Sequence, residues 1–181
     1  LSIGPNPLRV TGPVGTQRLA DTTLTMLRDD IGYRLDHHED LTWQPAIEVT
    51  EVTPSEPTAD SELAIVWQQG DVTIRCAPTD HRPVHPTVGY RIEAEGKVVV
   101  IAGDTIPCAG VDALCDRADV YVQTAIRDDI INTLPFQRLK DVVDYHSTVT
   151  QAAQTAQRCG VKHLVLTHPV PAPQPGQEHE W

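Results

Sequence analysis

The first third of the chain is only weakly patterned. It predicts a short strand over residues 8–10, a glycine- and proline-rich turn, and a helix that Thr16 caps and Gly32 ends. Residues 33–62 are polar and interrupted by prolines, so we expect a surface excursion there with one short strand at 47–49.

From Val72 onward the pattern becomes regular. Apolar and polar residues alternate first, and a nearly unbroken apolar run at 97–102 then predicts a strand that is covered on both faces. Thr148 with Gln151 forms a capping box for a helix that Gly160 ends. The expected fold class is therefore α/β, with strands at 72–76, 87–94, 97–102, 119–123 and 161–167 and helices at 109–117 and 148–160.

Length and charge narrow the function classes. At 181 residues the chain is long enough for one domain with its own core, and we expect a single domain over 1–181. Lys and Arg number 14 against 25 Asp and Glu, which gives a net charge of −11 without an evident basic cluster. This balance argues against a broad nucleic-acid footprint on this part of the molecule, although a local basic spot or a metal can still supply positive charge.

Cysteine spacing and hydropathy bear on location. Cys76, Cys108, Cys115 and Cys159 show no C-x-x-C spacing, which favours free, buried thiols in a reducing compartment. No apolar run approaches ~18 residues and no signal peptide is evident, so we expect a cytoplasmic protein without a membrane partner. The chain lacks an initiator Met and stops just after a proline-rich stretch, at residues 178–181, so we interpret both ends as cut or unobserved.

Three polar residues lie just past the ends of apolar strands. They are His81, Asp104 and His168. In layered α/β folds ligands bind beyond the carboxyl ends of strands, where loops bring polar groups together. Two imidazoles and a carboxylate form a ligand set that suits zinc. We expect these three side chains to meet at one point.

Several short motifs that include or surround these residues follow one another along the chain. They are GPVGT at 12–16, TDHRPV at 79–84, GYRI at 89–92, VIAGDT at 100–105, DYHST at 144–148 and LVLTH at 164–168. In this order the motifs resemble those of ribonuclease Z and its relatives in the metallo-β-lactamase superfamily. Actinobacterial-type members of the family look most similar to this chain. The resemblance covers essentially the whole chain. It implies an αββα sandwich, of which the second half and part of the first are present.

The resemblance also implies roles for individual residues. His81 matches the third histidine of one zinc, Asp104 the carboxylate that bridges two zincs, and His168 the terminal histidine of the second zinc. His146 matches a histidine that assists proton transfer to the leaving oxygen. Two such zinc ions polarise a phosphodiester, activate water and stabilise the departing oxyanion, and a neighbouring imidazole can donate the proton.

Other candidate groups are weaker. His85 is close to His81 but is expected to be an accessory loop residue, and His37-His38 is expected to be solvated surface. His163 begins a strand at the wrong end for the site, and His179 lies in the tail. Ser147 lacks a Gly-x-Ser-x-Gly elbow, so a helix-cap role is expected rather than that of a nucleophile.

The chain also departs from the family pattern. The His-x-His-x-Asp-His cluster is absent and would lie upstream of Leu1, together with the N-terminal strands. Each zinc therefore keeps only part of its ligand set, and we expect this chain alone to bind metal weakly and to be inactive. The turn at Glu95-Gly96 leaves no room for a long transfer-RNA-gripping arm. VQTA at 122–125 replaces a His-Glu-Ala-Thr motif, so the Glu partner of His146 is missing.

For the intact protein the resemblance implies a zinc-dependent endoribonuclease that acts on the 3′ side of precursor tRNA, or a phosphodiesterase with another substrate, and a homodimer. Two alternatives stay open. One is another hydrolase on the same scaffold, such as an arylsulfatase, a lactonase or a small phosphodiesterase. The other is a non-catalytic binding module in which the metal residues are vestigial.

Overall fold

The computed structural model describes residues 6–58, 62–173 and 175–176. The chain divides into two compact units, residues 1–53 and 54–181, and each is described by itself. The expectation about the cut C-terminal end, and with it His179, falls outside the described residues. Whether the two units form one domain stays a prediction.

The described part of the first unit, residues 6–53, contains two strands and two helices. Strand β1 (Leu8–Pro13) pairs in parallel with β2 (Ile47–Val52). Helices α1 (Thr16–Met26) and α2 (Arg28–His37) connect them. Because parallel strands need a crossover rather than a tight turn, the excursion after residue 33 brings the chain back to β1 and is not merely a surface loop.

Two expectations about α1 are wrong. Gly15, at a φ of 106°, occupies the N-cap position, and the Thr16 hydroxyl donates to the carbonyl of Pro13 instead. The carboxylate of Glu51 in β2 accepts from the backbone N–H of Gly15 and Gln17, at 2.7 and 3.0 Å, and so replaces a side-chain cap. Gly32 does not end the helix either, because the break falls at Leu27 and Gly32 lies inside α2.

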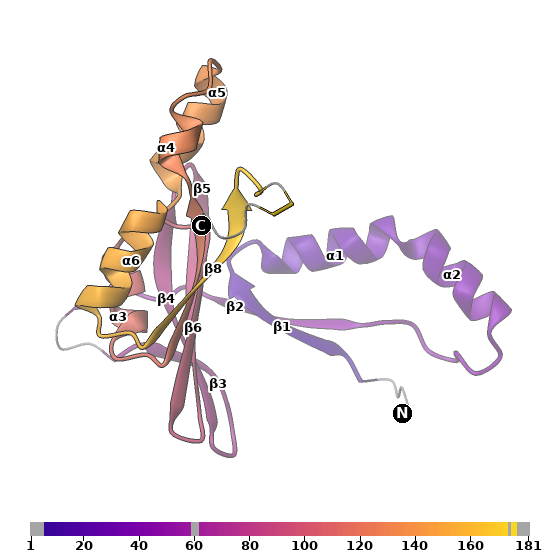
Figure 1. Cartoon of the computed structure of the whole chain (residues 1–181). Helices are drawn as coiled ribbons and strands as arrows, with labels where there is room; N and C mark the ends of the chain where they lie inside the picture. Colours follow the sequence, from indigo (N-terminus) through magenta and orange to yellow (C-terminus); the bar gives the residue numbers. More distant parts are fainter. Residues whose placement is uncertain (1–5, 59–61, 174, 177–181) are drawn as a thin grey trace. The chain divides into compact units, whose positions relative to one another are not determined.

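The second unit is built on a six-stranded sheet with the order β3-β4-β5-β6-β7-β8 (Figure 1). Neighbours from β3 to β6 are antiparallel, whereas the pairs β6–β7 and β7–β8 are parallel. The strands are β3 (Ala64–Gln69), β4 (Val72–His81), β5 (Val84–Ala94), β6 (Lys97–Gly103), β7 (Val120–Ile126) and β8 (His163–Val170). The sequence pattern missed β3.

Helices follow the parallel strands. They are α3 (Ala109–Cys115), α4 (Asp128–Ile131), α5 (Gln137–Lys140), a 3₁₀ helix η1 (Asp141–Tyr145) and α6 (Val149–Arg158). The capping box of Thr148 with Gln151 is present, and Gly160 follows α6 at a φ of 67°, so both predictions for this helix are confirmed. None of the helices in the described part of the chain is long and apolar enough to cross a membrane.

One face of this sheet carries the core. Val100, Leu114 and Tyr121 are fully buried where α3 and α6 lie over the sheet (Figure 1). The opposite face is more open, since Ile101 is 48% exposed and Val165 45%. The expectation that both faces of the strand at 97–102 are covered is therefore wrong for the described chain.

Candidate metal centre

The carboxyl ends of three strands converge on one polar cluster. His81 is the last residue of β4, Asp104 follows β6 directly, and His168 lies near the end of β8. His146 joins them from the segment between η1 and α6. The structure thus brings together the three residues expected to meet and adds the fourth.

Asp104 lies at the centre of the cluster and divides its two oxygens between different imidazoles. Its Oδ2 lies 3.9 Å from His81 Nε2 and 3.7 Å from His146 Nε2. Its Oδ1 lies 3.6 Å from His168 Nδ1. A carboxylate turned in this way can serve two cations, one through each oxygen.

Backbone carbonyls orient two of the rings. His81 Nδ1 lies 2.8 Å from the carbonyl oxygen of Tyr145, and His146 Nδ1 lies 3.0 Å from that of Val142. A carbonyl only accepts, so each Nδ1 donates a hydrogen bond, and each Nε2 is the ring nitrogen that faces Asp104. Proteins commonly orient metal-ligating histidines in this manner. The sequence pattern did not identify Val142 or Tyr145, because their main chains rather than their side chains act here.

Thr105 ties the contributing loops together. Its hydroxyl accepts from the backbone N–H of Asp80 at 3.0 Å, beside His81. Its carbonyl accepts from the backbone N–H and the hydroxyl of Ser147 at 2.9 and 2.7 Å, beside His146. Thr105 is fully buried. The expected helix-cap role of Ser147 is wrong, because Thr148 caps α6 and Ser147 binds the loop after Asp104.

The spacing of the donors fits a metal ion. Zinc lies about 2.0–2.1 Å from nitrogen and carboxylate ligands, so two tetrahedral ligand atoms are separated by roughly 3.4 Å. The ligand atoms of His81, Asp104 and His146 all lie within 4.8 Å of one another. His168 stands outside this compact group, with its side chain 59% exposed. Only proton transfer was expected of His146. Its position beside His81 and Asp104 also suits a metal ligand.

The comparisons with known proteins agree on one family. A family model described as a β-lactamase superfamily domain matches residues 14–169. A putative ribonuclease Z of Mycobacterium tuberculosis (strain CDC 1551 / Oshkosh) is 52% identical over 98% of this chain and 75% of its own length. The chain belongs to the metallo-β-lactamase superfamily, among its ribonuclease Z-like members.

The chain spans only part of the length of further similar proteins. The ribonuclease Z of Mycolicibacterium gilvum is 51% identical over 97% of this chain, which spans 58% of that relative's length. The crystal structure of the short form of human tRNase Z superposes with a TM-score of 0.61 over 93% of this chain and 63% of the other. At 24% identity this likeness shows the fold alone.

Within this ribonuclease Z-like chain, Gln123 stands where the resemblance places a Glu. Gln123 is buried, accepts from the hydroxyl of Tyr121 at 2.6 Å and donates to the carbonyl of Thr124 at 2.8 Å. The side-chain amide of Gln123 therefore makes these hydrogen bonds with residues of β7 beside the core. The Val142 carbonyl bonds His146 Nδ1, so His146 has an orienting partner without that Glu.

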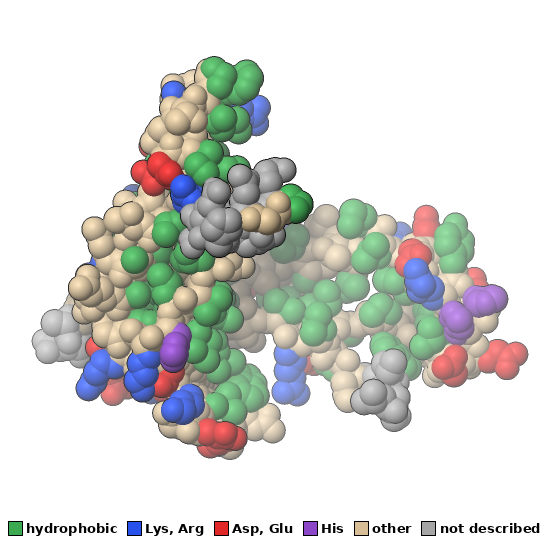
Figure 2. Space-filling view, in the orientation of Figure 1, with side chains coloured by type: hydrophobic (Ala, Val, Ile, Leu, Met, Phe, Trp, Pro, Cys, Tyr) green, Lys and Arg blue, Asp and Glu red, His purple; other side chains and the backbone are tan. Residues whose placement is uncertain are grey.

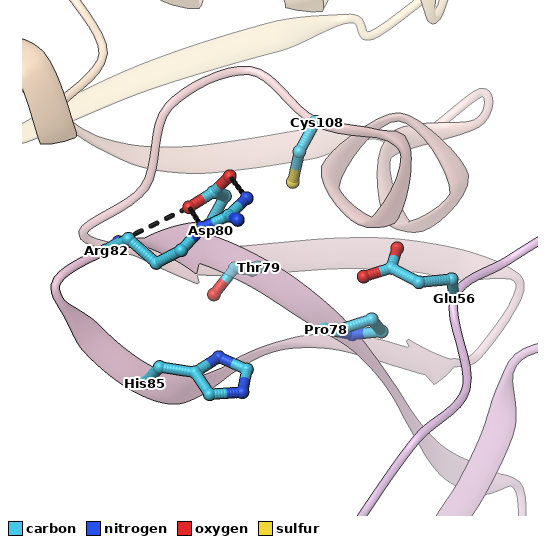
Figure 3. Close-up of a pocket in the computed structure, with 7 residues that line it drawn as sticks. All are labelled: Glu56, Pro78, Thr79, Asp80, Arg82, His85 and Cys108. Atoms are coloured by element: carbon cyan, nitrogen blue, oxygen red, sulfur yellow. Dashed lines mark hydrogen bonds and ion pairs between the residues drawn. The ribbon is translucent and has the colours of Figure 1, made fainter.

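Two further histidines of the second unit, His85 and His163, do not belong to this cluster. His85 belongs to β5 and not to a loop, which corrects the expectation. It lines a pocket of about 400 Å³ beside Asp80, whose carboxylate binds Arg82 (Figure 3). His163 is the first, exposed residue of β8, as expected, and His37 and His38 are exposed at the end of α2.

All four cysteines are free thiols, as expected. Cys76 and Cys115 are buried, whereas Cys108 and Cys159 are only partly so. Burial raises the pKa of the Cys115 thiol above its ordinary value, with the neighbouring Cys159 adding to the effect. Cys115 is therefore a protonated core residue and no candidate nucleophile.

Proposed function

We propose that the protein to which this chain belongs is a metal-dependent endoribonuclease that cleaves precursor tRNA on its 3′ side. The observation that carries the proposal is the carboxylate of Asp104, whose two oxygens face different imidazoles. The ribonuclease Z relatives give the substrate class. The net charge of −11 fits a site that neutralises phosphate with bound cations rather than with a basic surface.

His81, Asp104 and His168 are the proposed ligands of two zinc ions, with Asp104 shared between them. Imidazole nitrogens and a carboxylate are the donors that zinc prefers. Bound zinc supplies Lewis acidity toward a phosphodiester and a nucleophile at neutral pH. The residues of this chain contribute the fixed directions of these donors, because the carbonyl of Tyr145 holds the ring of His81.

His146 is the proposed proton donor to the leaving oxygen. Its side chain is buried, and its Nε2 faces the same space as the ligand atoms of His81 and Asp104. The carbonyl of Val142 keeps the ring in one orientation. If His146 transfers the proton, His146→Ala lowers turnover at unchanged zinc stoichiometry. A loss of one zinc per protein in this variant would instead make His146 a ligand.

The ligands in this chain are only part of a complete set. Each zinc would receive Asp104 and one expected histidine, His81 or His168, and structural or catalytic zinc sites usually have three or four protein ligands. We therefore propose that the 181-residue chain by itself binds zinc weakly and does not turn over phosphodiesters. The complete gene product is expected to carry the missing His-x-His-x-Asp-His donors.

Parallel assays on the complete gene product test the proposal. A precursor tRNA with a 3′ trailer and an aryl sulfate are each incubated with zinc-loaded protein, with Asp104→Asn as the inactive control. We expect cleavage at the 3′ side of the tRNA and no such cleavage by Asp104→Asn. Cleavage of the aryl sulfate alone would replace the nuclease with another hydrolase. The homodimer and the cytoplasmic location stay predictions. Light scattering during gel filtration measures the molar mass and so tests the homodimer.

A further inference from the structure

The cations of the second unit are almost all used in ion pairs. Among the described residues from 62 to 173, only Arg138 and Lys140 have no carboxylate within ion-pair distance, and both belong to α5. The paired cations and their partners are Arg75 and Arg91 with Glu93, Arg82 with Asp80, Lys97 and Lys162 with Asp119, Arg117 with Asp116, Arg127 with Asp129, and Arg158 with Asp112.

The same short helix exposes apolar side chains. Phe136, its N-cap residue, is 65% exposed, and Leu139 is 45% exposed. Residues 132–140 contain no Asp or Glu. Helices α4 and α5 project beyond the sheet, and green and blue side chains lie side by side at the end of this projection (Figures 1 and 2). We call residues 132–140 the α5 tip.

The α5 tip is joined directly to the metal centre. Lys140 is followed by η1, whose residues Val142 and Tyr145 supply the carbonyls that orient His146 and His81. A 3₁₀ helix rises about 2.0 Å per residue, so this segment spans roughly 10 Å. An RNA strand that contacts the α5 tip and the metal centre at once therefore needs only a few nucleotides between the two contacts.

We propose that the α5 tip is a contact for the RNA substrate, in which Phe136 stacks on a base and Arg138 and Lys140 bind backbone phosphates. The inference rests on the proposed function for its substrate class. An exposed aromatic beside cations that are not held in ion pairs is the combination that binds single-stranded nucleic acid. Because the chain carries a net charge of −11, a local contact of this kind replaces a broad basic surface.

RNA binding without catalysis tests the inference. Fluorescence anisotropy is measured in EDTA with the 181-residue chain and a labelled RNA that carries the acceptor stem and 3′ trailer of a precursor tRNA. Phe136→Ala is expected to weaken binding about tenfold. The double variant Arg138→Gln/Lys140→Gln is also expected to weaken RNA binding. Because two phosphate contacts are lost, a plot of log affinity against log salt concentration should become less steep.

Matched controls separate this contact from general charge effects. Arg18→Gln removes a cation of the first unit that likewise has no ion pair among the described residues, and Arg117→Gln removes an exposed cation of the second unit. Both are expected to leave RNA affinity within about twofold. Since the substituted tip side chains are mainly exposed, circular dichroism should show unchanged melting for every variant.

The outcomes distinguish the contact from the activity. Equal RNA affinity of Phe136→Ala and the unchanged chain, or no RNA binding by the chain at all, overturns the inference. Dissociation of a dimer by Phe136→Ala without loss of RNA affinity also overturns it, since the α5 tip would then bind a second copy. If the complete gene product fails to cleave precursor tRNA while the tip variants still weaken RNA binding, the proposed function fails and the contact stands.

Discussion

The carbonyl of Thr105 accepts two hydrogen bonds from Ser147, one from its backbone N–H and one from its hydroxyl. Thr105 follows Asp104 and Ser147 follows His146, so this contact sets the distance between the proposed shared ligand and the proposed proton donor. Both residues are buried, and their hydroxyls bind backbone groups of the neighbouring loops.

Removal of the Ser147 hydroxyl should therefore weaken both the fold and the site. Ser147→Ala loses one buried hydrogen bond, for which we expect a cost of about 1 kcal/mol in the free energy of unfolding. Urea denaturation measures this cost. Thr133→Ala is the control, because its hydroxyl makes a similar bond to the carbonyl of Ile130 at an exposed position. Equal costs for the two variants would contradict the structural role given to Ser147.

Gly110 permits the close approach of α3 to β4. A Cβ atom at this position would lie 1.7 Å from the carbonyl oxygen of Pro78, so Gly110→Ala must push the helix and the strand apart. We expect a loss of roughly 1–3 kcal/mol in the free energy of unfolding, as for other overpacked cores.

Gly32 gives the opposite result and serves as the control for Gly110. It lies inside α2, where nothing stands within 4 Å of an added Cβ. Gly32→Ala should raise stability by about 0.5–1 kcal/mol, because alanine loses less conformational freedom in a helix. Urea denaturation of both variants checks the pair, and destabilisation by both would contradict the described packing.

Asp119 makes stability depend on pH. The Lys162 ammonium and the backbone N–H of Val98, with desolvation opposing them, hold the pKa of this carboxyl below its usual value. A carboxyl with a lowered folded-state pKa stabilises the fold above its unfolded-state pKa, and this contribution is lost as the pH falls through the folded-state value.

Asp119→Asn tests this dependence. The variant should be less stable than the unchanged chain at about pH 7, and the difference should be smaller at about pH 3, because the contribution declines once the pH falls below the ordinary pKa of an aspartate. Urea denaturation at both pH values measures it, and Asp116→Asn, at an exposed position with a longer 3.5 Å ion pair, is the control. A difference that grows as the pH falls would contradict the assigned cause.

Local sequence signals predicted the second unit well. Thr148, Gln151 and Gly160 mark both ends of α6, because capping groups and a left-handed glycine act over a few residues. Glu95 and Gly96, at φ values of 52° and 69°, form the expected two-residue turn between β5 and β6. Such features depend on neighbours in sequence and can be recognised without a fold.

The misplaced features depend on distant partners. The N-terminus of α1 is capped by the carboxylate of Glu51 in β2, more than thirty residues from Gly15. Because this partner is distant in sequence, the local pattern assigned the capping role to Thr16 instead. Thr105 and the carbonyls of Val142 and Tyr145 have no side-chain signature for metal-centre work. His81, Asp104 and His168 were recognisable because each comes at or near the end of an apolar strand. The folded chain adds that the two oxygens of Asp104 face different histidines.

Zinc binding by Asp104→Asn tests the central claim most directly. Calorimetric titration of the 181-residue chain should show weak binding, and Asp104→Asn should lower the affinity at least tenfold, since the amide lacks the charge that serves both proposed ions. His163→Ala, at the opposite end of β8, should bind as the unchanged chain does. Equal zinc affinity and stoichiometry for Asp104→Asn and the unchanged chain would contradict the assignment of this metal centre.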